Sequence, residues 1–304
     1  MLKKSVNAFG PTIRSSLQGW SDKISWVKRY RYTAIEISIG YLELIFKGGL
    51  NPLRLQIAKK LFLNCGLVIS VHQPAVLDLR SRANGDMHIA VAKACLDFAE
   101  HIDSGVFVVH YTKESPSIKD EEIFIDRIRR LADYAEPKGI TIAIENIETG
   151  PAEAVAEIVD RLSLKNVGMA YDLPHDWLAA RRFDYDFLES AHKVAPYVKH
   201  IHLHDNFGIY AELRLKDFML YKTVPFSEWL PMGEGDLHLP IGWGNIPFDQ
   251  AIDRISPYTG MVITEYHLDK FSLEHRDIAQ TLAQKANMLW VRGKKRKNKE
   301  KPLK

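Results

Sequence analysis

The sequence predicts an α/β fold, a closed (β/α)8 TIM barrel. Eight short apolar or β-branched segments recur along the 304 residues, and helix-length segments separate them. Eight strand-then-helix units in one chain are the pattern of a closed parallel barrel. The alternative, a doubly wound open sheet, is disfavoured because no Gly-x-Gly-x-x-Gly motif follows the first segment. For the same reason we expect no nucleotide cofactor.

The eight expected strands share an enrichment in β-branched and apolar residues. They are residues 5–9, 33–39, 67–72, 106–110, 141–145, 167–172, 198–202 and 261–265. Helix signals lie between them. Apolar residues at three- and four-residue spacing predict a helix over 123–135, and Pro52 and Pro151 are suited to the first turns of two others.

We expect a single barrel domain over residues 1–291, with one insertion, followed by a tail. The length suits a barrel, since these folds routinely exceed ~200 residues as one domain. The longest departure from the repeat is the insertion 207–235, which we interpret as a lid because long connections in compact domains are usually functional or mobile. Residues 292–304 form a basic tail that we expect to be disordered.

The composition is that of an ordinary soluble protein, with 46% hydrophobic and 26% charged residues. No apolar run approaches the ~20 residues of a spanning helix, so we expect no membrane contact. Cys65 and Cys95 form no paired motif, which favours the reducing cytoplasm. The tail holds eight basic residues and one acidic residue, so the formal net charge of +3 becomes negative without it. Whether the protein forms a homo-oligomer is left open.

Six consecutive expected strands end in residues that can bind a metal ion. Histidine is not a turn former, so histidines at strand ends need another explanation. The residues concerned are His72, His110, Glu145, Asp172 with His175 three positions later, His202 and Glu265. In a barrel these ends meet at the C-terminal mouth, where active sites of this fold lie.

A divalent metal cofactor explains this convergence of imidazoles and carboxylates. Several buried like charges, with no lysine or arginine in the same motifs, would be costly, and a cation removes that cost. Mixed histidine and carboxylate donors without a thiolate do not identify the ion, and Mn, Co, Mg and Zn all remain candidates.

The chain resembles the xylose isomerase-like barrel superfamily, which includes sugar isomerases and epimerases and the endonuclease IV repair enzymes, over roughly residues 5 to 290. The resemblance is carried, in order, by SVHQP, VVHYT, IAIEN, YDLPH, HIHLHDN, DLHLPIGWG and ITEYH. For the isomerase and epimerase branch it implies a core metal site of Glu145, Asp172, His202 and Glu265, with His175 beside it. His202 is preferred because it stands three residues before Asp205, and His204 is the substitute.

Asp236 and His238, in the stretch GDLHLPIGWG, distinguish a larger donor set. The resemblance to endonuclease IV implies a trinuclear zinc site made by His72, His110, Glu145, Asp172, His175, His202, Asp236, His238 and Glu265. Two donors at i and i+2 on an extended loop can face the same cavity. The alternative is a glycine-rich loop with an incidental histidine. The motif HLP-x-G-x-G resembles the corresponding motif of the sugar isomerase-like proteins more closely than that of the repair enzymes.

Two enzymatic functions therefore remain open. The first, which we prefer, is a metal-dependent isomerase or epimerase of a sugar, sugar phosphate or related polyol, with Glu145 and Glu265 exchanging a proton. Its expected substrate-binding residues are His175, His204, Arg214 and Trp243. The second is a multinuclear zinc phosphodiesterase acting on abasic DNA, the one case in which nucleic acid is a partner. A metal-binding barrel without catalysis is a third possibility.

Overall fold

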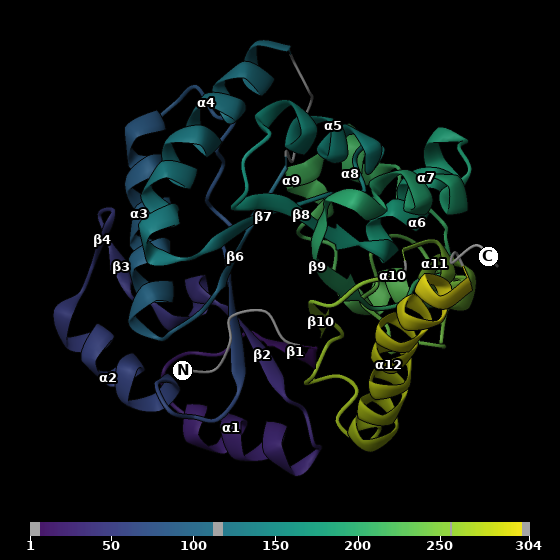
Figure 1. Cartoon of the computed structure of the whole chain (residues 1–304), viewed down its shortest axis with the longest axis horizontal. Coiled ribbons are helices and arrows are strands. Elements are labelled where there is room, and N and C mark those ends of the chain that lie inside the picture. Colours follow the sequence, from purple (N-terminus) through teal and green to yellow (C-terminus); the bar gives the residue numbers. More distant parts are fainter. Residues whose placement is uncertain (1–6, 112–117, 256, 300–304) are drawn as a thin grey trace.

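Eight parallel strands close into a barrel in the computed structural model, which describes residues 7–111, 118–255 and 257–299 (Figure 1). The order around the barrel is β1-β10-β9-β8-β7-β6-β5-β2. These strands are β1 (Ala8–Ile13), β2 (Ala34–Ser38), β5 (Val68–His72), β6 (Val106–His110), β7 (Thr141–Glu145), β8 (Val167–Asp172), β9 (Val198–Leu203) and β10 (Met261–Thr264). The predicted (β/α)8 barrel is confirmed.

The first strand is the one that the sequence places wrongly. It was expected at residues 5–9, whereas β1 begins at Ala8 and runs through Gly10 and Pro11, residues that commonly end strands. Gly10 is required there because a Cβ would collide with the carbonyl oxygen of Ala34 on β2. Pro11 nevertheless remains within the parallel pairing of β1 with β10, where it lies opposite Thr264. Residues 5 and 6 lie outside the described residues.

Helices follow the strands and cover the outside of the barrel. The helix predicted over 123–135 lies within α4, and Asn51 caps α2 by accepting the backbone N–H of Arg54 at 3.1 Å, with Pro52 in the first turn. The principal helices are α1 (Trp20–Arg29), α2 (Pro52–Phe62), α3 (Gly85–His101), α4 (Ile118–Ala135), α5 (Glu153–Leu162), α6 (Leu173–Phe183), α7 (Phe187–Val194), α11 (Phe248–Ile255) and α12 (His275–Lys299). Shorter elements are η1 (Ile39–Leu42), the hairpin β3 (Ile45–Phe46) and β4 (Gly49–Leu50), η2 (Glu136–Lys138) and η3 (Ala195–Tyr197).

The barrel interior changes from apolar to polar along its axis. One end is filled by two small apolar clusters, Ala8 with Ala34, Met261 and Ile263, and Val106 with Val108, Ala143 and Ala170. Alternate residues of a strand face the same side, so the interior positions that follow toward the C-terminal end include Glu36, His72, Glu145 and His202, all buried. The polar end of the barrel is thus positioned by strand periodicity alone.

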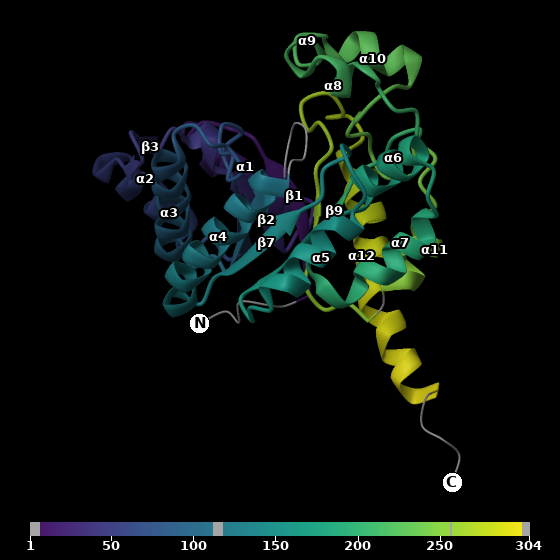
Figure 2. The ribbon, with the colours of Figure 1, turned by 90° about the horizontal axis from the view of Figure 1, so that it is seen from above.

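The insertion 207–235 contains three short helices, α8 (Leu213–Lys216), α9 (Phe218–Tyr221) and α10 (Phe226–Met232). Figure 2 shows them standing together at one end of the molecule, while the C-terminal half of α12 extends at the opposite end. Helix α12 continues through Lys299, so the first part of the expected tail is helical, and residues 300–304 lie outside the described residues. The boundary at residue 292 stays a prediction.

Within the described part of the chain, no helix combines the length and the apolar character needed to cross a bilayer. Both cysteines are buried and unpaired. The expected cytoplasmic location stays a prediction.

Candidate metal centre

The strand-end residues meet at the C-terminal mouth of the barrel, together with the loop that carries Asp236 and His238. Among the described residues, five groups of side chains have donor atoms that all lie within 4.8 Å of one another. Two of them include Glu36, once with His200 and His202 and once with His72 and Glu265, and three do not. The three groups without Glu36 are His72, His110 and Glu145; then Glu145, Asp172, His202 and Glu265; then His175, His204, Asp236 and His238. All nine residues of the larger expected set are brought together, and Glu145 belongs to two of the groups.

The second group has the spacing of ligands around one ion. His202 Nδ1 lies 3.5 Å from Glu145 Oε1 and 3.7 Å from Asp172 Oδ2, too far for strong hydrogen bonds. Donors held about 2.1 Å from one tetrahedral metal lie roughly 3.4 Å apart. His202 Nδ1 and Asp172 Oδ2 are buried without a hydrogen-bond partner among the described residues. Such buried polar atoms need a partner, and a divalent ion fits these donors.

Three histidines are oriented by backbone carbonyls, which can only accept hydrogen bonds. The Nδ1–H groups of His72, His175 and His238 donate to the carbonyl oxygens of Gln73 (3.0 Å), Asn146 (2.9 Å) and Glu265 (2.9 Å). Each ring therefore turns an Nε2 lone pair toward the centre. Fixing the metal-binding nitrogen through the other ring nitrogen is the usual arrangement in metal sites.

His200 and His202 on β9, and His204 directly after it, lie on the same face at successive heights. His200, the deepest, contacts Glu36 at 2.9 Å; His202 lies in the second donor group; His204 belongs to the third and stacks on His238 with ring centroids 4.0 Å apart. Both ring nitrogens of His204 are buried without a hydrogen-bond partner among the described residues. His204 was expected to bind substrate or to substitute for His202, and the structure places it among side chains that could hold a metal ion. Its role in substrate binding stays a prediction.

Electrostatics keep the carboxylates of the centre ionised. Burial by itself would raise the pKa of Glu145, but His110 and His202 hold it well below its usual range. Burial likewise opposes the effect of His238 and His175 on Asp236, whose pKa is nevertheless lowered. Ionised, buried carboxylates require positive charge beside them, either protonated histidine or a metal ion.

The loop around GDLHLPIGWG is bent so that both donors face inward. His238 adopts a left-handed conformation with φ 46°, which is uncommon for residues other than glycine and typical of functional sites. Asp205 anchors the loop: it exchanges backbone hydrogen bonds with Leu239 at 2.8 and 2.9 Å, and its carboxylate accepts the N–H of Gly242 at 2.8 Å. A Cβ on Gly244 would collide with the backbone of Asn206.

The insertion is attached to the loop after β7 by a buried ion pair. Arg214, on α8, pairs with Glu148, after β7, at 2.6 Å, and its guanidinium lies over the ring of Phe218. The hydroxyl of Tyr221 is positioned 3.2 Å from a Cβ built on Gly235, beside Asp236. Contact of Arg214 with substrate, and movement of the insertion as a lid, stay predictions.

Trp243 was expected to form an aromatic wall for a substrate. Its side chain is 49% exposed and packs edge-on against Phe271 at 5.4 Å between ring centroids. It lines neither of two cavities at the mouth, one bordered by His72 and His110 and the other by His238 and His267. Its role in substrate binding stays a prediction.

The sequence leaves open whether Glu36 takes part in the site. The structure places Glu36 directly beneath the second donor group. Glu36 accepts hydrogen bonds from Ser70 (2.9 Å) and Thr12 (3.1 Å), and its carboxylate lies 3.2 Å from His202 Nε2. Thr12 also donates to Glu265 at 3.0 Å. Glu36 therefore orients His202 so that Nδ1 faces the metal position. Period-two alternation on β2 puts Glu36 inside the barrel, but does not identify this contact.

Replacing Glu36 with glutamine is expected to weaken metal binding by 10–100-fold, because the charged acceptor behind His202 is lost. Metal dissociation constants measured by chelator competition would check this. Ser70→Ala is the matched control, since it removes a hydrogen bond to Glu36 but leaves the contact with His202. Equal affinities in Glu36→Gln and the wild type would show that Glu36 does not support the ligand.

Arg14 is a site residue that the sequence did not reveal. It follows β1, lies 3.4 Å from Glu265 and borders both cavities at the mouth. The strand-end motifs themselves contain no lysine or arginine. Closure of the barrel nevertheless brings Arg14 beside them. Only the pairing of β1 with β10 makes this visible.

The fold is that of the (β/α)8 barrels, and its C-terminal mouth carries side chains that could hold a metal ion. The chain matches the family model described as xylose isomerase-like TIM barrel over residues 24–292. The protein belongs to this family, and the resemblance inferred from the strand-end motifs is confirmed.

Known relatives are distant in sequence. An uncharacterised protein of Methanocaldococcus jannaschii is 26% identical over 205 residues, which cover 63% of this chain and 60% of that protein. The chain thus spans less than two thirds of that relative's length.

Similar solved structures share the fold over nearly the whole chain. A D-tagatose 3-epimerase-like protein is 21% identical with a TM-score of 0.68, covering 92% of this chain and 98% of that one. The 3-keto-D-glucoside 4-epimerase from E. coli is 14% identical (TM-score 0.64; 91% and 99%). A D-psicose 3-epimerase crystallised in the presence of D-fructose is also 14% identical, with a TM-score of 0.65, and the match covers 93% of this chain and 99% of that one.

Proposed function

We propose that the protein is a divalent-metal-dependent isomerase or epimerase acting on a small sugar-like substrate, either a sugar, a sugar phosphate or a related polyol. The observation that carries the proposal is the second donor group, in which Glu145 from β7 and Glu265 after β10 share one position with Asp172 and His202. Two carboxylates that flank a single metal position from different strands are suited to moving a proton between them. The epimerases among the similar structures support this choice.

A bound divalent ion would polarise a carbonyl next to a hydroxyl-bearing carbon and so acidify the neighbouring C–H. Glu145 and Glu265 would then take and return the proton at their carboxylate oxygens. Their pKa values are held below the usual range by nearby positive groups despite burial, so both are ready to accept a proton. The hydrogen bond from Thr12 to Glu265 Oε1 orients that carboxylate and leaves Oε2 beside Arg14.

A second function, an endonuclease IV-like multinuclear zinc phosphodiesterase acting on abasic DNA, is favoured by a specific observation. Possible donors form further groups besides the second one, and Asp236 and His238 belong to the third together with His175 and His204. Isomerisation requires only the second group. Adjacent ions in several groups would supply the charge stabilisation that phosphodiester cleavage needs. The negative charge of the chain without its basic segment 292–304 argues against a duplex-binding surface.

Asp236→Asn separates the two functions. For an isomerase or epimerase we expect the variant to retain metal in the second group and to lose less than about tenfold in turnover, because the four donors there are untouched. A hydrolase would lose several hundredfold, in line with the contribution of single electrostatic groups to catalysis. Metal per chain would be measured by elemental analysis of the wild type and the variant.

Activity would be followed on the same preparations by two assays. Ketohexoses such as D-fructose and D-tagatose would be incubated in D2O, and incorporation of deuterium beside the carbonyl followed by proton NMR. Nicking of abasic duplex DNA would be measured in parallel. Cleavage of DNA by a protein that holds three metal ions and exchanges no carbon-bound hydrogen would overturn the isomerase proposal in favour of the second function.

A further inference from the structure

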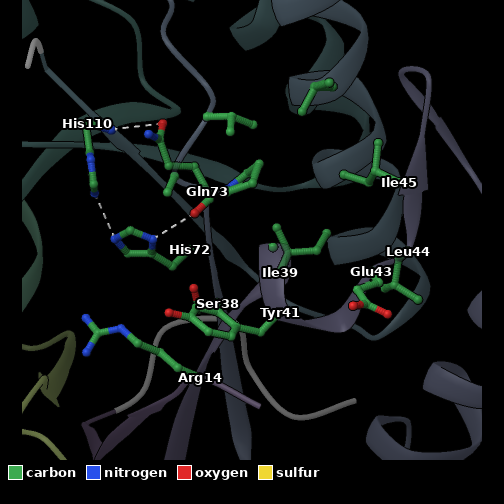
Figure 3. A pocket seen from close by; sticks show the side chains of 15 residues that line it. Arg14, Ser38, Ile39, Tyr41, Glu43, Leu44, Ile45, His72, Gln73 and His110 are labelled. Carbon is green, nitrogen blue, oxygen red and sulfur yellow. Dashed lines mark hydrogen bonds between the residues drawn. The ribbon is translucent and has the colours of Figure 1, made fainter. Parts of the chain in front are cut away.

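A cavity of about 530 Å³ opens beside the first donor group, and its two ends differ in chemistry. Figure 3 shows His72, His110, Gln73 and Arg14 at one end and Leu44 and Ile45 at the other, with Ile39 between them. Glu43 also lies at the second end, where its carboxylate pairs with Arg54 at 3.3 Å. Pro74, Val76 and Val91 extend the apolar end. The volume is in the range of small-molecule sites, which combine an apolar lining with a few convergent polar groups.

The apolar end is built by three elements that pack closely on one another. Gly40 of η1 is so close to the loop after β5 that a Cβ would lie 3.2 Å from Pro74 Cβ. Lys47 and Gly48 form the tip of the β3–β4 hairpin, both with positive φ (49° and 78°), as a two-residue type I′ turn requires. A Cβ on Gly48 would lie 2.8 Å from Ala90 on α3. The apolar wall formed by η1, the β3–β4 hairpin and α3 is therefore preformed.

This wall presents apolar surface to the same cavity that His72 and His110 line. Val76 is 78% exposed, and Ile45 and Val91 are each partly exposed. An apolar group that covered them would gain free energy in proportion to the area removed from water. The hydroxyls of a plain polyol would lose hydration against the same wall without gaining hydrogen bonds. The wall thus favours a ligand that is polar at one end only.

We propose that the substrate carries an apolar substituent, of the size of a hexyl chain or a phenyl ring, bound between η1, the β3–β4 hairpin and α3. Its polar, sugar-like part then faces His72, His110 and Arg14. This inference rests on the proposed isomerase or epimerase function for the polar part alone. The apolar subsite follows from the cavity whichever reaction the metal centre performs.

Alkyl hydroxamates test the subsite, because their two adjacent oxygens chelate divalent ions. Binding of acetohydroxamate and hexanohydroxamate to the manganese-loaded full chain would be measured by calorimetry. The four extra methylenes are expected to tighten binding at least about tenfold, since each buried methylene contributes appreciably. Val76→Asp and Ile45→Asp are expected to abolish most of this preference while changing acetohydroxamate binding less than about twofold.

Leu273→Asp is the matched control: Leu273 is 94% exposed and does not line the cavity, so the preference should be unchanged. Equal affinities of the two hydroxamates for the wild type would overturn the subsite, as would a preference that survives both cavity variants. If neither hydroxamate binds, the polar end holds no accessible metal and the proposal fails with it. A preference sensitive to Val76 in a protein without hydrogen exchange would overturn the proposed function but retain the subsite.

Discussion

Glu145→Gln is expected to abolish turnover and to remove metal from two donor groups at once. Glu145 Oε2 lies 3.2 Å from His72 Nε2 and 3.4 Å from His110 Nε2, while Oε1 lies 3.5 Å from His202 Nδ1. Glutamine keeps the size of the side chain but replaces a charged oxygen with an amide nitrogen that cannot bind a cation. Loss of a general base alone costs about 10²–10⁴-fold, so turnover should fall by at least about a thousandfold.

Metal content and turnover of Glu145→Gln would be compared with those of Glu153→Gln. Glu153 begins α5 in the same strand-then-helix unit and pairs with Lys193 on the surface, so its replacement should leave both quantities unchanged. Circular dichroism would show that both variants fold. A Glu145→Gln protein with the full metal content and full turnover would exclude Glu145 from both mechanisms.

Most of the metal centre could be predicted because strand periodicity determines it. His72 and Glu145 end buried strands and His202 lies one residue before the end of another, and in a parallel barrel residues at strand ends that face inward must converge. The height difference among the histidines of β9 follows from the same alternation. Asp236 and His238 lie outside the strands; their spacing allows both to face one cavity, and the resemblance to endonuclease IV implied them as ligands.

What the sequence could not show depends on closure of the barrel and on side-chain packing. Arg14 and Glu265 are 251 positions apart and meet only because β1 pairs with β10. The nitrogen that each histidine offers depends on backbone carbonyls from other segments. The orientation of aromatic rings is also not encoded in a motif; Trp177, for example, packs on Phe187 at 5.3 Å between ring centroids. Adjacency in sequence says little about which way a bulky ring turns.

Removal of the metal is expected to destabilise the protein by an amount that grows with pH between about 6.5 and 9. Burial would lower the pKa of His72, but its hydrogen bond to Glu145 and the nearby carboxylates raise it to about 9. A histidine with a raised pKa stabilises the folded metal-free chain fully below its unfolded pKa of about 6.5, and this contribution is lost as the pH rises through 9. Metal and proton compete for His72, so metal stabilisation increases over the same window.

The size of the effect follows from binding linkage. Free metal at about a thousand times its dissociation constant contributes about 4 kcal/mol, which corresponds to roughly 10 °C in melting temperature for a chain of this size. Displacing one proton makes the metal affinity rise about tenfold per pH unit within the window. Asp176, whose pKa is raised to about 6 mainly by burial, titrates below the window in both forms and cancels in the difference.

Melting temperatures of metal-loaded and chelator-treated protein would be measured at pH 6.5, 7.5 and 8.5. The gap between the two forms should widen at each step. His72→Gln should make the trend less steep because one competing proton is gone, while the raised pKa values of His175, His202 and His238 leave other protons to compete. At acidic pH the relevant group is Asp172. Burial alone would raise the pKa of Asp172, but the nearby His175 and His204 outweigh burial and hold this pKa low. The carboxylate therefore keeps its stabilising charge until well below its unfolded pKa of about 3.9. A gap that stayed constant from pH 6.5 to 8.5 would mean that His72 does not bind the metal.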